Sequence, residues 1–497
     1  MKKILLTLTT FLLIFSFYLY FSLFRPLQSC LHLTTTDQTT TCLQQLSHTE
    51  KTLHFLDHFI PSSSLDTLIS LISISQPLLP HQHYFLGQNQ PTTYLILLQN
   101  DSELRANGGF FGSYAVLTLD HSQPSLRFQD IYVPDGQIQG HVDPPEPIQQ
   151  AFRQGWFRLR DSDWDPDFPT AATTIRWFFD KGNEISPDLL VTLPLSTIEN
   201  ILDITGPIEL DQYQLSLTSD NLFISLQNLI EQDFFPGSTQ KRDVLTTLGQ
   251  TVSQRLLHLS LQQKLAVIDV LLTSLEQQNI ILNSTQPQIQ TIFTQNNWAG
   301  QLQPTPCTTN LCLADTIAII ETNLGSNKAN AYLDRHTTHT ITTDSHYLTH
   351  QITINYTNNS PEETPNPPQH HGGNYINYLR FYLPLNTENI TLTAQPTLPL
   401  TLDYYPEPII TSSPLLLPTT TRHEFLETGF FHTTRSLSSS QLTLTYQLPI
   451  NSSTTYQLSL LKQHGLTSSP QTINILDQQL TTNLEQDFLF NSTLTTD

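Results

Sequence analysis

A chain of 497 residues is long enough for two or three domains and a sizeable buried core. Its 21 Lys and Arg against 43 Asp and Glu give a formal charge of −22, which argues against a general affinity for nucleic acid, because phosphates need cations to neutralise them. The hydrophobic share of 38%, with 26 Phe and 17 Tyr, excludes a chain that is disordered throughout.

The first predicted element is a membrane anchor. Residues 4–24 carry no charge and would span about 32 Å as a helix, enough to cross the hydrocarbon core of a bilayer. Lys2 and Lys3, in the short end 1–3, should stay cytoplasmic. A cleaved signal peptide is the alternative, but no A-x-A-like site follows the apolar run. We therefore expect an uncleaved signal anchor, a single pass through the cell membrane and an extracytoplasmic location for the bulk of the chain.

The four cysteines fall into two close pairs, Cys30 with Cys42 and Cys307 with Cys312. In an oxidising compartment each pair can close a small loop, which predicts two local disulfides. A zinc site of four thiolates is the alternative, although neither pair has the C-x-x-C spacing usual for one.

Helical and strand patterns follow the anchor. Residues 25–84 are predicted to form a stalk with helical pieces, because apolar residues recur at helical spacing. The apolar run 94–98 is typical of a strand buried on both faces, and further strands are predicted over 114–119 and 126–133. A helix is predicted over 169–180, with Gly182 near its end. Residues 188–210 then predict a strand, a helix and a strand, joined by a right-handed crossover within an α/β sheet.

The second half of the chain changes its pattern. Helical periodicity over about 220–279 predicts a helical insertion within an extracytoplasmic α/β domain that covers 85–330. Alternating, β-branched segments then predict a β-sandwich-like domain over 331–480, followed by a polar tail over 481–497. The predicted fold class is α/β, a mixed sheet with helices, followed by a C-terminal β-sandwich-like domain.

The first candidate site lies in residues 100–112, directly after the first buried strand. Ligands of open α/β sheets gather at the carboxyl ends of strands. Three glycines within five residues indicate unusual backbone angles or a ligand close to the backbone. Arg105 beside them can hold a phosphate or a carboxylate. The other candidate ligand-binding residues are Asn100, Glu103, Gly108 and Gly109. The alternative is a tight turn in which Arg105 pairs with Glu103 or Asp101.

The second candidate site lies in residues 158–169. Four carboxylates at alternate positions, Asp161, Asp163, Asp165 and Asp167, can wrap a hard cation such as Mg²⁺ or Ca²⁺. Arg158 and Arg160 would then meet phosphate oxygens that the metal also bridges. The alternative is structural: Asp167 caps the following helix, and Arg160 pairs with a nearby carboxylate.

Most of the chain, from about 85 to 470, resembles the bacterial domain of unknown function 4012 family. The shared residues are Tyr94 to Asn100, Glu103-Leu-Arg105, Gly108-Gly109-Phe110, Leu159-Arg160-Asp161, Trp164, Asp167-Phe168-Pro169, Gly206-Pro207, Asn323 to Asn330, Tyr378 to Pro384 and Lys462 to Gly465. The resemblance implies a membrane-anchored envelope protein without an established activity. Asp163 and Asp165 are not among the shared positions, which leaves Asp161 and Asp167 as the candidate catalytic and metal residues.

The first domain is also distantly similar to the LytR-CpsA-Psr proteins, which move glycopolymers from polyprenyl pyrophosphate carriers onto the cell wall. The shared features are the anchor helix, a strand near 94–98 and the strand, helix, turn and strand over 188–210. This resemblance implies that arginines and Mg²⁺ hold the pyrophosphate. The chain departs from that family where Val133-Pro134-Asp135-Gly136 replaces its Pro-Arg-Asp, so Arg105, Arg158 and Arg160 would supply the positive charge.

Two functions follow from these patterns. The first is an Mg²⁺-dependent phosphotransferase that binds a polyprenyl-pyrophosphate-linked glycopolymer, with a C-terminal domain that contacts glycan or a partner. The alternative is a non-catalytic extracytoplasmic binding or structural surface protein with a degenerate ligand site. Metal-dependent binding of pyrophosphate separates the two, whereas an arginine site for an acidic glycan would bind without metal.

Overall fold

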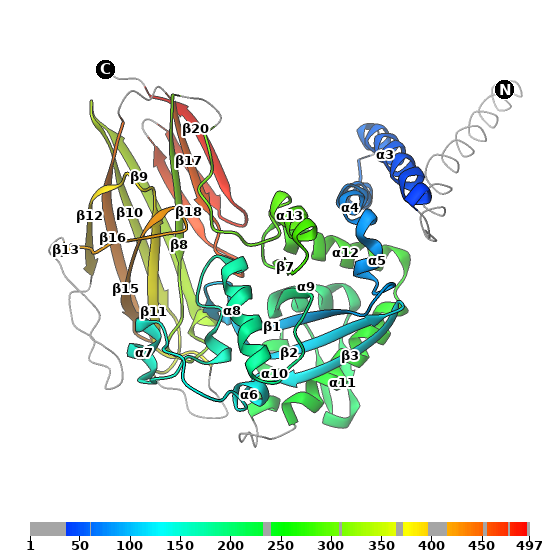
Figure 1. The fold of residues 1–497 in the computed structure, drawn as a ribbon. Coiled ribbons are helices and arrows are strands. Elements are labelled where there is room, and N and C mark those ends of the chain that lie inside the picture. Colours follow the sequence, from blue (N-terminus) through cyan, green and yellow to red (C-terminus); the bar gives the residue numbers. More distant parts are fainter. Residues whose placement is uncertain are drawn as a thin grey trace, which may run out of the picture.

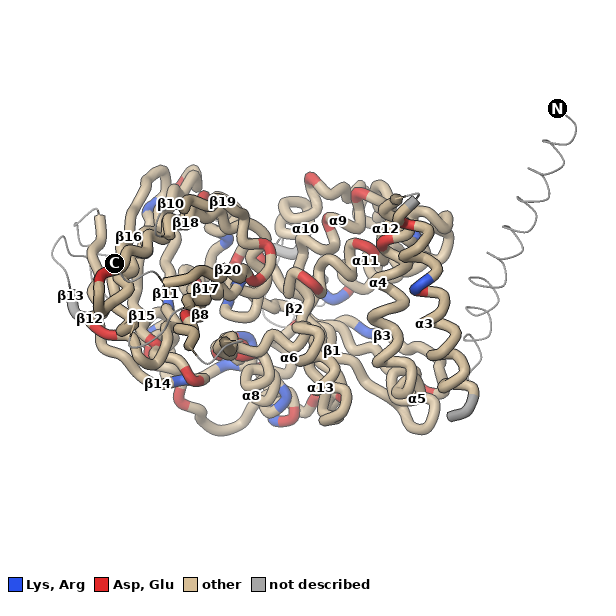
Figure 2. Tube along the Cα trace, turned by 90° about the horizontal axis from the view of Figure 1, so that it is seen from above, with Lys and Arg blue, Asp and Glu red and all other residues tan. Residues whose placement is uncertain are grey.

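A computed structural model describes residues 36–59, 61–231, 240–307, 311–363, 371–395, 415–450, 455–475 and 478–494. An α/β unit and a β-sandwich lie side by side in both views of the chain (Figures 1 and 2). The membrane anchor predicted over 4–24 lies outside the described residues. Among the helices within them, none is both long and apolar enough to span a bilayer.

Two helices precede the sheet, as the helical spacing predicts. They are α3 (Thr36–Phe59) and α4 (Ser63–Leu78), followed by η2 (Leu79–His81) and α5 (Gln82–Phe85). Leu46 and Leu53 of α3 pack against Ile69 and Ile72 of α4. The Thr67 hydroxyl of α4 donates to Asp269 Oδ1 at 2.8 Å, in the later helix α12 (Leu261–Glu276). The helices of the predicted stalk therefore pack onto the α/β unit.

The α/β unit is built on a mixed five-stranded sheet in the order β3-β2-β1-β4-β7. Its strands are β1 (Thr92–Arg105), β2 (Gly108–Asp120), β3 (Gln123–Asp130), β4 (Leu189–Pro194) and β7 (Leu282–Ser284). Only β1 and β4 pair in parallel, and the other neighbours are antiparallel. The strand predicted over 126–133 ends at Asp130, because the short helix α6 (Tyr132–Asp135) follows and Pro134 has no N–H for a sheet ladder.

Helices cover the two faces of this sheet differently. Leu95 and Leu97 of β1 are fully buried on the face that carries α8 (Phe168–Lys181). Ile96 and Leu98 are only half-buried on the opposite face, so the predicted burial of this strand on both faces is incomplete. The prediction of a helix that ends near Gly182 is confirmed. Two short helices, α7 (Glu146–Phe152) and η3 (Leu159–Asp161), lie between α6 and α8.

The predicted crossover after β4 is wrong. Helix α9 (Leu195–Thr205) forms as expected, but β5 (Ile208–Leu210) pairs with β6 (Leu215–Leu217) in a separate two-stranded sheet. Both edges of β4 are already occupied, by β1 and β7, so no edge is left for β5. The expected helical insertion is confirmed by α10 (Leu222–Glu231), α11 (Gln240–Leu257) and α12, and α13 (Pro287–Gln295) follows β7.

The C-terminal β-sandwich is confirmed. A seven-stranded sheet in the order β13-β12-β16-β10-β9-β18-β19 packs against a six-stranded sheet in the order β14-β15-β11-β8-β17-β20. The strands are β8 (Cys312–Ile320), β9 (Leu333–Thr343), β10 (Tyr347–Asn358), β11 (Tyr375–Leu383), β12 (Glu388–Gln395), β13 (Leu415–Leu416), β14 (Thr420–Arg422), β15 (Phe425–Thr434), β16 (Ser438–Pro449), β17 (Thr455–Leu461), β18 (Pro470–Ile475), β19 (Gln478–Asn483) and β20 (Phe488–Thr493). The 3-10 helix η5 (Ala329–Tyr332) precedes β9.

The sandwich extends beyond its predicted range of 331–480 at both ends. Strand β8 begins at Cys312 and pairs with β11 and β17. Strand β20 lies in the segment predicted as a polar tail, where Phe488 and Phe490 pack against the sandwich core. Every second residue of β20 is exposed, and Asn491, Ser492 and Thr493 follow its three apolar residues, so the polar composition of the segment hides the strand.

One of the two predicted disulfides lies entirely in the described chain. Cys307 and Cys312 are bonded, with their Cα atoms 5.9 Å apart. Cys42 is also disulfide-bonded, and Cys30, its predicted partner, lies outside the described residues. The disulfide at Cys307 and Cys312 excludes the zinc site of four thiolates.

Candidate functional site

The carboxyl end of β1 is irregular, and this irregularity explains the glycines of the first candidate segment. The pairing of β1 with β2 shifts register around Asn100. A Cβ atom on Gly109 would overlap the backbone of Asn100, and Gly108 has a φ of +116°. Both glycines therefore serve the close approach of two strands at a bulge.

Arg105 is paired within its own segment, as the turn alternative predicts. Its Nη2 donates to Glu103 Oε1 at 2.9 Å, and its Nη1 donates to the Asn323 carbonyl oxygen. The second oxygen of Glu103 lies 3.0 Å from Lys328 Nζ. Arg105 and Glu103 are buried, so Glu103 holds two cations side by side in a largely desolvated place.

Arg160 and Asp161 lie next to this group. Arg160 Nη1 donates to Asp135 Oδ2 at 2.8 Å, and its guanidinium carbon lies 5.2 Å from the centre of the Tyr132 ring. Burial raises the pKa of Asp161, while the positive charges of Arg105 and Arg160 oppose that rise. The structure thus brings the predicted residues Arg105, Arg160 and Asp161 together. With Glu103, Asp135 and Lys328 they form what we call the charged cluster.

The remaining carboxylates of the second segment have separate partners. Asp167 is the N-cap of α8: one oxygen accepts from Thr170 N at 3.1 Å, and the other accepts from Leu302 N at 3.0 Å. The capping alternative is therefore confirmed. Asp165 Oδ1 accepts from His423 Nε2 at 2.7 Å. Asp163 is buried without a hydrogen-bond partner for its carboxylate, and this burial raises its pKa to about 7.

These positions do not assemble the expected cation site. Across the described ranges, no group of three or more His, Cys, Asp or Glu side chains is arranged to hold a metal ion. Asp167 does not fit the role of an Mg²⁺ ligand, because both of its oxygens already accept backbone hydrogen bonds. Asp161 is the predicted metal residue that lies beside cations suited to phosphate.

Arg158 lies apart from the charged cluster. It is half-buried, and its guanidinium carbon lies 4.8 Å from the centre of the Trp156 ring. The structure therefore separates Arg158 from the two other arginines that were predicted to share one phosphate.

An apolar cavity of about 250 Å³ opens on the half-buried face of the sheet. It lies at the carboxyl ends of β1 and β4, under α9, α10 and α11. Its apolar lining consists of Leu98, Phe110, Leu193, Leu195, Ile198, Leu222, Phe223, Leu226, Leu245 and Leu248. Its polar lining includes Asn100, Tyr132 and Lys328. Such a cavity accepts an apolar body of modest size and a few polar contacts.

The cavity and the charged cluster share a wall. Three residues that line the cavity, Phe110, Tyr132 and Lys328, each also contact a charged side chain of the cluster. Arg105 lies 5.3 Å from the Phe110 ring centre, Arg160 lies over Tyr132, and Glu103 pairs with Lys328. The arrangement can therefore hold a molecule with an apolar body and an anionic head.

Sequence reasoning missed the cavity wall and Lys328. The leucines of α10 and α11 repeat at helical spacing, which is equally typical of a helix that covers a filled core. Lys328 lies in the segment 323–330, where the sequence offers no signal of a site apart from the family resemblance and the presence of a lysine in a chain with so few cations.

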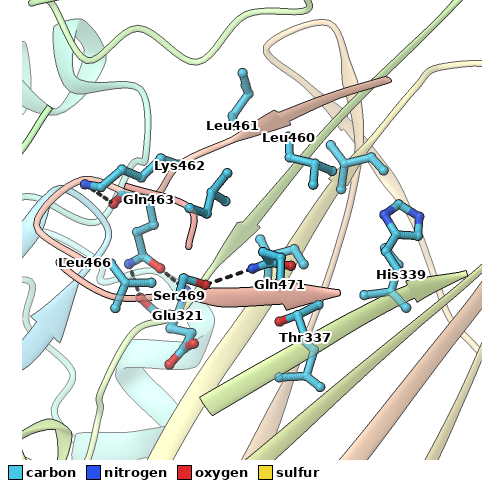
Figure 3. Close-up of a pocket in the computed structure, with 15 residues that line it drawn as sticks. Glu321, Thr337, His339, Leu460, Leu461, Lys462, Gln463, Leu466, Ser469 and Gln471 are labelled. Carbon is cyan, nitrogen blue, oxygen red and sulfur yellow. Dashed lines mark hydrogen bonds between the residues drawn. The ribbon is translucent and has the colours of Figure 1, made fainter. Parts of the chain in front are cut away.

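A second cavity, of about 40 Å³, lies inside the sandwich near the α/β unit (Figure 3). Gln463 Nε2 donates to the Glu321 carbonyl oxygen at 2.7 Å, and Lys462 Nζ donates to Asn279 Oδ1 at 2.9 Å. This volume holds only a few water molecules. We therefore do not consider it a ligand site.

Comparison with known proteins confirms the first resemblance over part of the chain. Residues 89–230 match the model of a family described as a protein of unknown function, DUF4012. Two solved structures are similar to the chain. A transcriptional regulator from Bacillus subtilis shows 14% identity over 44% of this chain and 83% of its own, with a TM-score of 0.24. A transcriptional regulator from Enterococcus faecalis shows 12% identity over 44% and 78%, with a TM-score of 0.26. No curated protein matches the sequence.

Proposed function

We propose that the protein binds a polyprenyl-pyrophosphate-linked glycopolymer, with part of the lipid chain in the apolar cavity and the pyrophosphate at the charged cluster. The observation that carries this proposal is the shared wall of Phe110, Tyr132 and Lys328 between the two. An amphiphile suits this arrangement, because its apolar chain can lie in the cavity while its charged head contacts the charged cluster.

The energetics of the two sides support this assignment. Apolar surface removed from water contributes about 25 cal/mol per Å², so the leucine-lined cavity favours a hydrocarbon chain. The head would meet the guanidinium groups of Arg105 and Arg160 and the ammonium of Lys328. The head would compete for these three cations with the carboxylates of Glu103 and Asp135.

The proposed activity is phosphotransfer to an acceptor hydroxyl. The hydroxyl oxygen forms a bond to phosphorus, the bond to the polyprenyl phosphate leaving group breaks, and Asp161 takes the hydroxyl proton. Burial raises the pKa of Asp161, which makes it a better base than an ordinary carboxylate. The cations would stabilise the charge that develops on the phosphoryl oxygens. No step of this proposal requires Mg²⁺ at Asp167.

The predicted anchor belongs to the same proposal. A single pass over 4–24 would hold the site outside the cell and close to the membrane in which polyprenyl carriers reside. The glycan part of the ligand would remain outside the cavity.

Binding of polyprenyl pyrophosphate to the full-length protein in detergent tests the proposal. We expect binding that becomes at least tenfold weaker when Leu226→Trp or Ile198→Phe fills the cavity, and when Arg160→Gln removes a cation. Arg242→Gln, on the exposed side of α11, is the matched control and should leave the affinity unchanged. Parallel titrations with Mg²⁺ and with a chelator show whether the metal contributes.

The opposite result favours the alternative function. If the folded protein does not bind the lipid in either condition, or if the cavity variants bind as tightly as the wild type, the proposed ligand is wrong. The protein would then be a non-catalytic surface protein, in which the β-sandwich carries the binding or structural role.

A further inference from the structure

Two of the four tryptophans are exposed on the α/β unit. Trp156 is 51% exposed and Trp177 is 44% exposed, whereas Trp298 is buried and Trp164 is half-buried. An indole ring has a large apolar surface, and an exposed ring does not contribute the free energy of stabilisation that its burial would give. Exposed rings of this size mark interaction surfaces when they lie together with polar groups that can bind a ligand.

Trp156 lies in the loop between α7 and η3. The next residue, Phe157, packs on Phe178 of α8 with ring centres 5.3 Å apart. The backbone N–H of Leu159 donates to Asp135 Oδ1 at 2.8 Å, which ties this loop to α6. Figure 1 shows α6 close to one end of α8, beside the sheet. Tyr132 of α6 is 40% exposed and also lines the cavity, so the loop and the cavity mouth are neighbours.

Arg158 gives this loop a cation without a carboxylate. Two other cations of this unit are paired: Arg160 with Asp135 at 2.8 Å, and Lys181 with Asp180 at 3.2 Å. Within the described residues Arg158 forms no ion pair and only covers the Trp156 ring. A half-buried guanidinium without a carboxylate is suited to an anionic group from a ligand.

We propose that Trp156 and Arg158 bind a negatively charged polysaccharide. This inference rests on the proposed function, since the sugar chain of the ligand or of its acceptor would lie just outside the cavity. The faces of sugar rings present C–H groups, which pack on the negative face of an indole ring. The guanidinium of Arg158 supplies a fork of donors for a carboxylate or a phosphate.

A sugar chain fits this loop better than a bilayer does. The carboxylates of Asp143 and Asp180 are 94% and 64% exposed on the same part of the α/β unit. A membrane surface would cover them and, if anionic, repel them. A chain that is one ring wide contacts Trp156 and Arg158 and leaves both carboxylates in water.

Direct binding of soluble polysaccharides to the full-length protein tests the inference. The probes are hyaluronan and polygalacturonate fragments, with a neutral chitin oligosaccharide as their uncharged counterpart, and the readouts are calorimetry and tryptophan fluorescence. We expect Trp156→Ala and Arg158→Gln each to weaken binding of an anionic probe at least tenfold. Leu437→Ala, at an exposed apolar residue of the sandwich, is the control and should have no effect.

Each other outcome contradicts the inference. Absence of binding to either anionic probe, or binding that both variants retain, overturns it. Equal binding of the neutral and anionic probes also overturns it, since Arg158 would then have no role. Binding to anionic vesicles that Trp156→Ala abolishes, without binding of any sugar, would assign the loop to a membrane. The cavity variant Leu226→Trp should leave sugar binding intact, so that failure of lipid binding and failure of sugar binding are distinguishable.

Discussion

The backbone of Asn107, in the turn between β1 and β2, pairs with the backbone of His464, in the loop after β17. This parallel bridge joins the α/β unit to the sandwich. Beside it, Gln463 Nε2 donates to the carbonyl oxygens of Arg105 and Glu321, at 3.0 and 2.7 Å. The end of β1 that carries the charged cluster is therefore held by the sandwich, and the stability of this junction determines how well the cluster is positioned.

Replacing Gly465 by Ala should destabilise the protein through this junction. Gly465 has a φ of +69°, and a Cβ atom there would overlap the Cα atom of Gly108. We expect a loss of about 1–3 kcal/mol in the free energy of unfolding for the backbone strain, and more for the overlap. Chemical denaturation measures it. Gly140→Ala is the matched control, since Gly140 has a φ of +96° with nothing within 4 Å of its Cβ position. Equal losses of unfolding free energy in the two variants would mean that the close approach of Gly465 to Gly108 does not limit stability.

Asp167→Ala should cost about 1 kcal/mol of stability, because the variant removes the N-cap of α8. Leaving the Leu302 N–H without its acceptor adds to this loss. Asp167→Asn, which keeps an acceptor oxygen, should retain most of the stability. Thermal and chemical unfolding of both variants check this. A variant of normal stability that no longer binds lipid pyrophosphate would instead support the predicted role of Asp167 as a ligand-site residue.

The sequence predicts α8 because residues next to the helix mark its ends, whereas the pairing of β5 depends on a strand that is distant in the sequence. Asp167 before an apolar pattern and Gly182 after it mark both ends of that helix. By contrast, β5 leaves the main sheet because β7, more than 70 residues later in the chain, occupies the edge of β4. The sequence around β5 does not show that another strand pairs with this edge of β4.

The sequence predicts the pairing of Arg105 with Glu103, and of Arg160 with a nearby carboxylate, as alternatives to a ligand site, and the structure has both pairs. The sequence does not predict that the two pairs lie together, where the charges of both arginines act on Asp161. Lys328 joins them from a segment more than 150 residues away. Arg158, two residues from Arg160, lies instead on Trp156, because the short helix η3 begins at Leu159 and turns the two side chains apart.

Asp163→Asn should remove a pH dependence of stability. Burial raises the pKa of Asp163 to about 7, against about 4 in an unfolded chain. The folded state therefore binds the proton more tightly, and its contribution to stability is lost as the pH rises from about 4 to 7. We expect the stability of Asp163→Asn relative to the wild type to increase over this interval. Urea titrations at several pH values measure the difference, with the exposed Asp143→Asn as control. A constant difference would contradict the burial of an unpartnered carboxyl at position 163.

His339→Gln should make the sandwich less sensitive to acid. His339 Nε2 lies 3.1 Å from His350 Nδ1, and the His350 ring stacks on Tyr446 with centres 4.4 Å apart. Burial lowers the pKa of His339 to about 3 and also lowers that of His350. The unfolded chain binds these protons near pH 6.5, so stability is lost as the pH falls below that value, by up to about 1.4 kcal/mol per pH unit for each histidine.

The buried carboxyl of Asp315, in the same core, changes the stability of the sandwich with pH in the opposite direction to the two histidines. It accepts from the Tyr456 hydroxyl at 2.5 Å, and burial raises its pKa to about 7, so its contribution strengthens as the pH falls. Asp315 is present in both the His339→Gln variant and the wild type, so its contribution to the free energy of unfolding cancels when the two are compared. The difference in unfolding free energy should shift in favour of the variant between pH 6.5 and pH 4, while the exposed His346→Gln should track the wild type. If both variants lose stability in parallel with the wild type on acidification, His339 is not the buried neutral group that limits the acid stability of the sandwich.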